Sequence, residues 1–393
     1  MSSKKKVLFL LPELLGPGGQ ELEIIGFAKS LFSDPRFEVA LLNFYAPFHV
    51  KELEKLPHLD WNISQLNSVI FNKKFLKIFL KSGFRFQASL ANCFRNFPEL
   101  FDSWLSQKLS GFDLCFAGIS PTGLLPHVLK LCVQNKVSFV YHESSIFHPK
   151  NDHFYRLMKK NGSFLISAEA KEAYLLEHYP LADYSIIKQW VYLGQDKFLQ
   201  IDSGIHDPIK FGYVGRVDNG KNLSLILEAI NLLKKKGHQT EFLLFGDGPE
   251  LEELKVFAQK SGIADLVKFK GKFPFEQRHT CFSEMDVFVM SSTFEGGPLV
   301  ILEAMGAGKP IITTNVGDVP KRVFDDQNGY VLPVDCTASA FSNKMEVYLT
   351  QKEKVQEHGK RSRELFLRDF EEKSCEKIFK ESLLGILSSR STK

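Results

Sequence analysis

Two glutamates and a glycine-rich corner are the residues of this chain most suited to chemistry. In the stretch FEGGPLVILEAMGAGKP, Glu295 and Glu303 stand eight positions apart, and Gly296, Gly297 and Pro298 follow the first of them. Carboxylates accept hydrogen bonds from sugar hydroxyls, whereas cations and backbone amides hold phosphate. Glycine lets a backbone approach a ligand closely, and proline suits the first turn of a helix. This spacing therefore predicts a tight ligand-binding loop between a strand and a helix.

The elements around that corner have recognisable patterns. DVFVM, before it, is short and apolar enough for a buried strand, and LVILEAMGA, from Leu299 on, has helical apolar spacing and ends at Gly308, a suitable C′ residue. Unpaired N–H groups of the first helical turn favour an anion. A ligand that is part phosphate and part polyol would use both the carboxylates and these amides. The alternative is that Glu295 is only solvated and that Glu303 only caps the helix.

Cations follow another predicted strand. YVGRVDNGKN supplies Gly215, Arg216 and Lys221, and an arginine fork with a nearby lysine suits a diphosphate. LLFGDGPE places Gly246 after the next strand, where Asp247 could be only a turn residue. Loops at the carboxyl ends of parallel strands bind ligands in doubly wound sheets, so these loops are expected to meet.

The first half contains two further candidates for ligand binding, a glycine-rich loop and a histidine. LPELLGPGGQELE follows the first apolar run, and its Gly16, Gly18 and Gly19 permit close approach by a phosphate or a sugar. His142, in FVYHESS, ends another strand and could serve a site or be purely structural.

Composition limits the class of protein. The length of 393 residues favours two or three domains, and 44% hydrophobic residues suffice for substantial cores. The six cysteines are scattered without metal-ligand spacing, as expected for reduced thiols in a cytosolic protein. Residues 1–200 carry 23 Lys+Arg and 18 Asp+Glu, a net charge of 23 − 18 = +5, which is too mild for a nucleic-acid binder.

A basic segment, 71–81, is the exception to this even charge. At 100° per residue four lysines share one quadrant and apolar residues lie opposite, namely Lys73, Lys74, Lys77 and Lys81 against Phe71, Phe75, Ile78 and Phe79. Such a helix is compatible with an anionic membrane surface, or with phenylalanines in the core and lysines in water.

The lysine-rich start resembles a signal peptide, but Pro12 and Glu13 interrupt the apolar run, and we expect neither a signal peptide nor a membrane span.

Apolar runs alternate with helical segments along the chain. The second half contains IKFGYV, EFLLFG, VKFKG, DVFVM, PIITT and GYVLP, and the first half contains KVLFLLP, FEVALLNF, NSVIF, FDLCFAG, VSFVYHE, SFLISA and YSIIKQWV. This alternation predicts an α/β protein with two Rossmann-like, doubly wound domains facing across a cleft. We place an acceptor-side domain at 1–200, a linker near 195–208 and a donor-binding domain at 205–370. A helix at about 370–393 is expected to pack back on the first domain.

Taken together, GPGGQELE, YVGRVDNGKN, LLFGDGPELEELK and STFEGGPLVILEAMGAGKPIITTNVGDVP resemble the retaining, nucleotide-sugar-dependent glycosyltransferases of the GT-B fold, family 4 (glycosyl transferases group 1). The resemblance covers the second domain and the opening loop of the first. It implies that Glu303 holds the donor ribose, that Glu295 and the amides after it hold the donor sugar, and that His142 contacts that sugar. Arg216 and Lys221 match the diphosphate-binding pair, and Gly18 and Gly19 the N-terminal glycine loop.

The implied reaction is transfer of a hexosyl group to an acceptor hydroxyl, with retention, in the biosynthesis of a polysaccharide, lipopolysaccharide or glycolipid. Fixed cations and helix amides would stabilise the departing nucleoside diphosphate, and we expect neither a metal nor another cofactor. The expected partners are a nucleotide sugar and a glycan or lipid-linked acceptor, and the expected place is the cytoplasm or the cytoplasmic face of a membrane. Two alternatives are a nucleotide-sugar epimerase of the same fold and a non-catalytic nucleotide-sugar-binding or membrane-docking subunit.

Overall fold

The computed structural model divides the chain into two compact units. The first comprises residues 1–188 with 375–393, and the second comprises 189–374. The structure describes residues 3–11, 19–43, 73–81, 93, 96–118, 124–143, 149–167, 169–202 and 204–390. Among the sequence features discussed above, the strand predicted at NSVIF, Gly16, Gly18 and Phe71 lie outside these ranges.

The first unit is built on a six-stranded parallel sheet with the order β2-β1-β3-β4-β5-β6. Its strands are β1 (Lys5–Leu11), β2 (Phe37–Asn43), β3 (Leu114–Ala117), β4 (Ser138–Glu143), β5 (Ser163–Ile166) and β6 (Asp183–Ile186). Its helices include α1 (Gly19–Phe32), α3 (Lys73–Lys81), α5 (Asp102–Leu109), α6 (Leu124–Gln134), α7 (Asp152–Asn161) and α8 (Glu169–His178). Each of these strands falls within a predicted apolar run or one residue from it.

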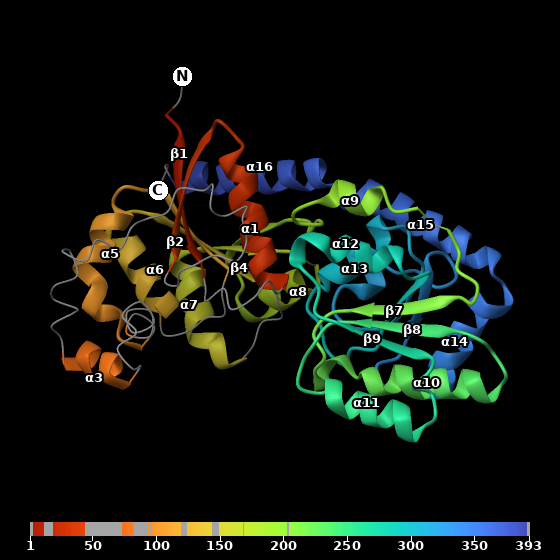
Figure 1. The fold of residues 1–393 in the computed structure, drawn as a ribbon. Coiled ribbons are helices and arrows are strands. Elements are labelled where there is room, and N and C mark those ends of the chain that lie inside the picture. Colours follow the sequence, from red (N-terminus) through yellow and green to blue (C-terminus); the bar gives the residue numbers. More distant parts are fainter. Residues whose placement is uncertain are drawn as a thin grey trace. The chain divides into compact units, whose positions relative to one another are not determined.

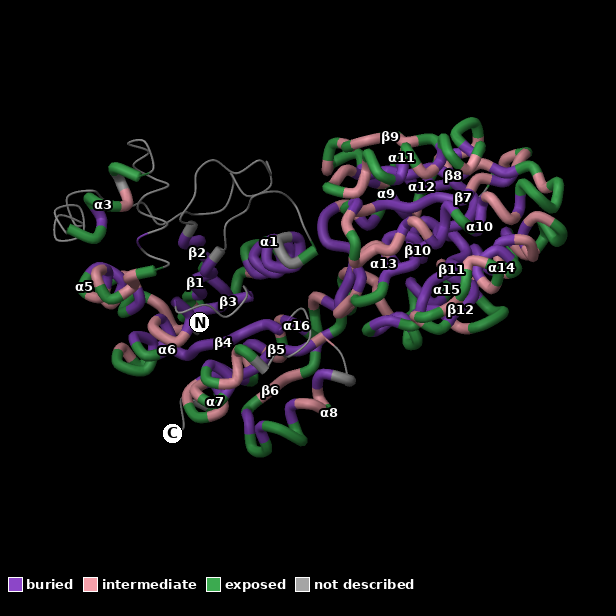
Figure 2. Tube along the Cα trace, turned by 90° about the horizontal axis from the view of Figure 1, so that it is seen from below, coloured by how far each residue is buried: buried purple, intermediate pink, exposed green. Residues whose placement is uncertain are grey.

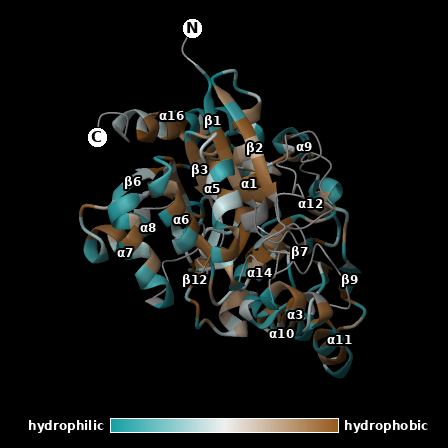
Figure 3. Ribbon diagram, turned by 90° about the vertical axis from the view of Figure 1, so that its left-hand side faces the viewer, coloured by the Kyte–Doolittle hydropathy of each residue, from teal (hydrophilic) through white to brown (hydrophobic). Residues whose placement is uncertain are grey.

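The central strands of this sheet are mostly apolar, so both faces of the sheet must be covered by helices. β3, β4 and β5 are buried along their whole length, as expected for parallel strands between helical layers. Figure 3 shows the hydrophobic residues, in brown, along β1 and β2. On one face Phe27 of α1 stacks on Phe379 at a centroid distance of 4.4 Å, so the C-terminal helix α16 (Glu372–Arg390) packs within this unit beside α1.

The second unit contains another six-stranded parallel sheet, with the order β12-β11-β10-β7-β8-β9. Its strands are β7 (Lys210–Val214), β8 (Glu241–Phe245), β9 (Val267–Gly271), β10 (Val287–Met290), β11 (Ile311–Thr314) and β12 (Gly329–Leu332). All six predicted strands are confirmed. The order reverses at the neighbouring strands β7 and β10, which is the switch point where doubly wound sheets bind ligands.

Helices cover both faces of this sheet (Figure 1). One layer contains α10 (Leu223–Lys235), packed against α11 (Leu251–Lys260) and α14 (Ala338–Thr350); the other contains α13 (Leu299–Gly306), packed against α9 (Gln195–Leu199) and α15 (Glu353–Asp369). The short α12 (Arg278–Ser283) contacts α9. Figure 2 shows the buried residues, in purple, concentrated along the strands of this unit, and exposed residues, in green, on its outer helices and loops.

The end of α13 confirms the predicted role of Gly308. Its φ is +67°, Lys309 N donates to Ala304 O at 2.9 Å, and Gly308 N donates to Met305 O at 3.0 Å. These two bonds form a Schellman motif, which needs a left-handed residue at C′. The helix that carries Glu303 therefore has a defined end, at a residue where glycine avoids the strain of a side chain.

Candidate active site

The loops after β7 and β10 bring Lys221 and Glu295 into contact. Lys221 Nζ lies 2.6 Å from Glu295 Oε1, and Ser292 Oγ donates to the same oxygen at 2.8 Å. Both charged side chains are partly buried. The prediction that these loops meet at the carboxyl edge of the sheet therefore holds for the lysine and the first glutamate of the motif, 74 residues apart in sequence.

Backbone contacts hold these two loops together. Thr293 N donates to Gly220 O at 2.9 Å, and Ser291 Oγ lies 2.9 Å from Lys221 O and 2.8 Å from Asn222 O. Asn222 adopts the left-handed conformation, with φ at +47°, directly before α10, and asparagine tolerates that region better than most residues. The position of Lys221 is thus determined by the loop that carries Glu295.

Arg216 lies in the same loop but remains accessible. Its Nε and Nη2 contact Asp218 Oδ2 at 3.0 and 2.9 Å, and 78% of its side-chain surface is exposed. The Arg216 carbonyl accepts a hydrogen bond from Tyr213 Oη at 2.8 Å, which fixes the backbone while the guanidinium stays in solvent. The structure does not bring Arg216 into hydrogen-bonding contact with Lys221 or Glu295.

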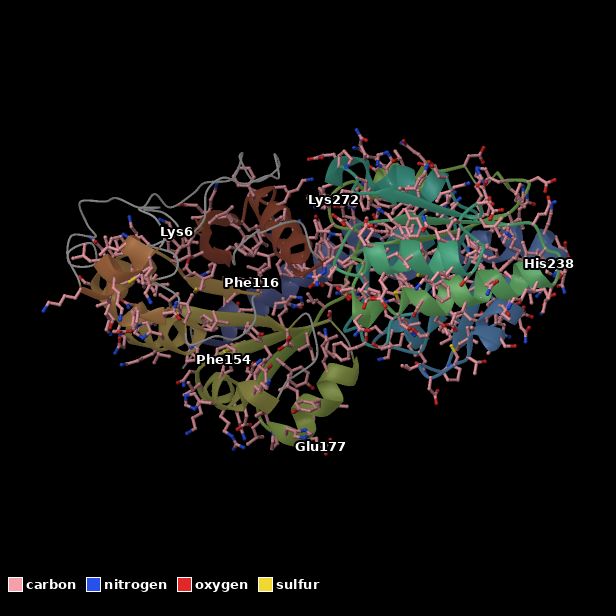
Figure 4. The ribbon with its side chains drawn as sticks, turned by 60° about the horizontal axis from the view of Figure 1, so that its bottom comes forward. Lys6, Phe116, Phe154, Glu177, His238 and Lys272 are labelled. Carbon is pink, nitrogen blue, oxygen red and sulfur yellow. The ribbon has the colours of Figure 1, made fainter. Side chains whose placement is uncertain are left out.

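Gly215 and Gly246 pack backbone against backbone. A Cβ built on Gly246, whose φ is +148°, would lie 1.8 Å from Gly215 O. Only glycine allows the two loops to approach this closely. Next to them Asp247 pairs with Lys272 at 3.1 Å, and this contact lowers the pKa of Asp247. Lys272, labelled in Figure 4, is a third cation at this edge that sequence reasoning did not select.

The Gly-Gly-Pro corner rests on a buried polar cluster. A Cβ on Gly297 would lie 2.6 Å from Gln189 Oε1 and 3.1 Å from Asp318 Oδ2. Arg322 donates to the Pro298 carbonyl at 3.0 Å and to Gln189, so this cluster supports the start of α13. Leu299 is the first residue of that helix and Pro298 its N-cap. The participants come from separate segments, and no local pattern in the sequence marks Arg322.

Glu303 occupies a different environment from Glu295. It is buried in α13, and Arg278 Nε donates to its Oε1 at 2.7 Å. Burial raises the pKa of Glu303, while the Arg278 charge and hydrogen bond act in the opposite direction. Sequence reasoning missed Arg278, because it lies in another helix, 25 residues away, and outside the motif that contains Glu303.

The histidine candidate of the first unit lies in its core. His142 is buried: its Nδ1 donates to Leu165 O at 3.0 Å, and its Nε2 lies 3.3 Å from Glu23 Oε2. Contact with a sugar would require the ring to leave one of these partners, and its proposed role stays a prediction. Gly19 begins α1, while Gly18 lies outside the described residues.

The described residues also bear on metal binding and on membrane crossing. In the described ranges no three His, Cys, Asp or Glu side chains gather closely enough to hold a metal ion. No helix in the same ranges has the length and apolar character needed to cross a bilayer.

Solved structures share a fold with two Rossmann-like domains. A crystal structure of Anabaena Alr3699/HepE in complex with UDP aligns with a TM-score of 0.74 and 16% identity, over 97% of this chain and 100% of that one. The crystal structure of TarM aligns with a TM-score of 0.75 and 14% identity, over 98% of each chain. The fold is therefore the GT-B fold of glycosyltransferases, as predicted.

A family model matches the segment that contains the site. Residues 196–365, which lie within the second unit, match the model of the glycosyl transferases group 1. The matched segment includes Arg216, Lys221, Arg278, Glu295 and Glu303.

Curated relatives align with about a third of the chain. The amylovoran biosynthesis glycosyltransferase AmsK of Erwinia amylovora is 28% identical over 145 residues, which is 35% of this chain and 36% of the relative. The putative glycosyltransferase EpsF of Bacillus subtilis is 34% identical over 109 residues, 28% of each chain. The putative colanic acid biosynthesis glycosyltransferase WcaL of Escherichia coli is 27% identical over 132 residues, 32% of each. The alignments thus span about a third of the length of these relatives.

Proposed function

We propose that the protein is a glycosyltransferase that moves a sugar from a nucleotide-diphosphate sugar to an acceptor hydroxyl. The observation that carries this proposal is the Lys221–Glu295 pair at the switch point of the second sheet, within the segment that matches the family. A cation and a carboxylate in one place suit a ligand that joins a diphosphate to a polyol.

The ion pair suggests how the site changes when the donor binds. Lys221 and Glu295 form an ion pair at 2.6 Å and neutralise each other. A diphosphate with two negative charges competes with one carboxylate for the lysine. Glu295 would then become available to accept hydrogen bonds from the sugar hydroxyls, while Lys221 and the accessible Arg216 hold the diphosphate.

The proposed chemistry is same-face substitution with retention of configuration. The bond between the anomeric carbon and the diphosphate oxygen breaks, the acceptor oxygen bonds to that carbon, and the acceptor proton passes to the departing diphosphate. Lys221 and Arg216 would stabilise the negative charge that grows on the leaving group. Glu303 is assigned to the donor ribose.

The acceptor is proposed to be a growing cell-surface glycan or a lipid-linked precursor on the cytoplasmic side of a membrane. Support comes from the relatives named for amylovoran and colanic acid biosynthesis, whose alignments cover 35% and 32% of this chain.

A panel of nucleotide sugars tests the activity. The purified chain is incubated with each donor, with and without glycan acceptors, and release of free nucleotide and the product sugar are followed. Acceptor-dependent release of nucleoside diphosphate supports the proposal. Conversion of the sugar nucleotide alone would identify an epimerase instead, and donor binding without turnover a non-catalytic subunit.

The reaction is expected to proceed without a divalent metal. The basis is the presence of Lys221 and Arg216 at the edge of the sheet, because fixed cations can neutralise a departing diphosphate. Donor consumption in the presence of EDTA should equal that in its absence. Loss of activity with EDTA and recovery with Mn²⁺ or Mg²⁺ would contradict the proposed leaving-group chemistry.

Helix α3 is the proposed membrane contact. Phe75 is buried, whereas Leu76 and Leu80 expose 41% and 62% of their surface. Lys73, Lys77 and Lys81 are exposed beside these leucines on the helical wheel, while Lys74 pairs with Glu99 at 2.8 Å. An exposed arc of leucines next to lysines fits the interface of an anionic bilayer, where apolar side chains insert and cations meet headgroups.

Vesicle binding provides the test of this contact. Each lysine near an anionic surface contributes about 1 kcal/mol, so Gln at positions 73, 77 and 81 should weaken binding to phosphatidylglycerol vesicles by roughly 10²-fold at low salt. The matched control places Gln at the exposed Lys235, Lys260 and Lys268 of the second unit, with the same charge change. Equal losses in both triple variants would show that net charge, rather than α3, mediates binding.

A further inference from the structure

Arg278 is the centre of a buried contact network beside the site. Its Nε donates to Glu303 Oε1 at 2.7 Å, and its Nη2 donates to Tyr192 O at 2.5 Å and to Leu193 O at 2.7 Å. The guanidinium carbon lies 4.3 Å from the ring centroid of Phe275. These contacts occupy the planar donor fork and one of its faces, so the guanidinium has a single orientation.

Glu303, which Arg278 binds through Oε1, has its second carboxylate oxygen available for another partner. Among the described residues, Oε2 of Glu303 accepts no hydrogen bond, and 10% of the side-chain surface remains exposed. A buried carboxylate with one oxygen committed and the other available is suited to accept a hydrogen bond from a neutral donor such as a hydroxyl group.

We propose that Arg278 is a positioning residue for Glu303, which it holds in one orientation so that Oε2 accepts a hydrogen bond from the ribose of the donor nucleotide. This inference rests on the proposed function and adds to it a residue outside the sequence motifs. Arg278 does not touch the ribose itself. It acts through the carboxylate, and its backbone contacts tie residues 192 and 193 to the same network.

The preference of the protein for a ribonucleotide over its 2′-deoxy form, called ribose discrimination here, tests whether Arg278 positions Glu303 or is merely structural. The probes are UDP, GDP and ADP, each compared with its 2′-deoxy form. Their dissociation constants are measured by calorimetry between about pH 4 and pH 9, a range that begins near the ordinary pKa of a glutamate and extends well above it. The loss of a hydrogen bond to a charged group costs roughly 10- to 100-fold in affinity. The wild-type protein should therefore prefer the ribonucleotide, and Arg278→Met should lose most of that preference.

The pH profile gives a second readout. Without Arg278 the pKa of Glu303 should rise further, because burial raises it and the arginine opposes that rise. Affinity that needs the ionised form is lost as pH falls through the pKa, so Arg278→Met should lose ribonucleotide affinity at a higher pH than the wild type does. The double variant Arg278→Met with Glu303→Gln removes both charges, and it should bind weakly with no such pH dependence.

Arg363 offers the matched control. It is another partly buried arginine near α13, and it donates to two backbone carbonyls, Gly306 O at 3.2 Å and Ile201 O at 2.8 Å. Arg363→Met should lower thermal stability while leaving ribose discrimination and the pH profile unchanged. If Arg278→Met misfolds, ribose discrimination and the pH profile are compared with the wild type in Arg278→Lys and in the double variant that lacks both charges.

The outcomes distinguish the two proposals. Failure of the wild-type protein to bind any nucleoside diphosphate would overturn the proposed function together with this inference. Wild-type binding with ribose discrimination, together with an unchanged ratio and pH profile in Arg278→Met, would overturn the positioning role alone. Parallel losses in the Arg278 and Arg363 variants would show that Arg278 is only structural.

Discussion

Lys221→Ala is expected to lower kcat by about 10²–10³-fold at saturating donor, equivalent to roughly 3 kcal/mol for one preorganised charge contact. If Lys221 neutralises charge that grows on the diphosphate as the glycosidic bond breaks, its contact is stronger in the transition state than in the ground state. Such a loss appears in kcat, whereas a contact of equal strength in both states changes KM only. Initial rates over a range of donor concentrations separate these cases.

The structure provides controls for this experiment. Lys234→Ala removes an exposed ion pair with Asp265 in the same unit and should leave kcat unchanged. Arg216→Ala should lower kcat by a similar factor to Lys221→Ala, because Arg216 is assigned to the same leaving group. Glu303→Gln should mainly raise the donor KM, since the ribose is remote from the breaking bond. Normal kcat in both cation variants would rule out the leaving-group role, even with the family assignment intact.

Gly246→Ala is expected to cause the largest loss of stability among simple substitutions at the site. Its φ of +148° is strained for an alanine, and the new Cβ would lie 1.8 Å from Gly215 O, a backbone atom that cannot turn aside. Strained backbone costs about 1–3 kcal/mol and overpacking about 1–3 kcal/mol more. The free energy of unfolding, measured with urea, should therefore fall by roughly 2–6 kcal/mol, and donor turnover should fall because Gly215 precedes Arg216.

Gly262→Ala isolates the conformational part of that cost. Gly262 also has a positive φ, +68°, but a Cβ there would meet no atom within 4 Å. The expected loss is about 1–2 kcal/mol, the usual cost of a left-handed non-glycine residue. If the two alanine variants were equally stable, the close approach of the loops at Gly215 and Gly246 would not be a constraint on the fold.

Much of the fold was predictable because its signals are local. In the second unit each parallel strand is a short apolar run followed by a helical segment, and all six predicted strands are present. Gly308 was assignable to the C′ position because the left-handed conformation there favours glycine. The carboxyl-edge placement of Lys221 and Glu295 followed from the rule that ligands bind at the ends of parallel strands.

Other features depended on long-range packing. The chain divides into compact units at Lys188 and Gln189, with residues 375–393 in the first unit, whereas the sequence suggested a linker near 195–208. Gln189 belongs to the second unit, where Arg322 donates to it from 133 residues away. Residue composition can indicate a linker. The boundary of a compact unit depends instead on contacts between residues far apart in the sequence, which composition does not predict.

The sequence by itself determined the fold class, the strands of the second sheet and the candidate site residues, because apolar periodicity and glycine-rich loops are properties of neighbouring residues. Only the tertiary structure decided which polar side chains meet. Lys221 meets Glu295, Arg278 meets Glu303, and His142 meets Glu23, 119 residues away in sequence. The reason is electrostatic. A buried or half-buried charge is tolerated where a partner stands within hydrogen-bonding distance, and that partner is supplied by the packing of distant elements.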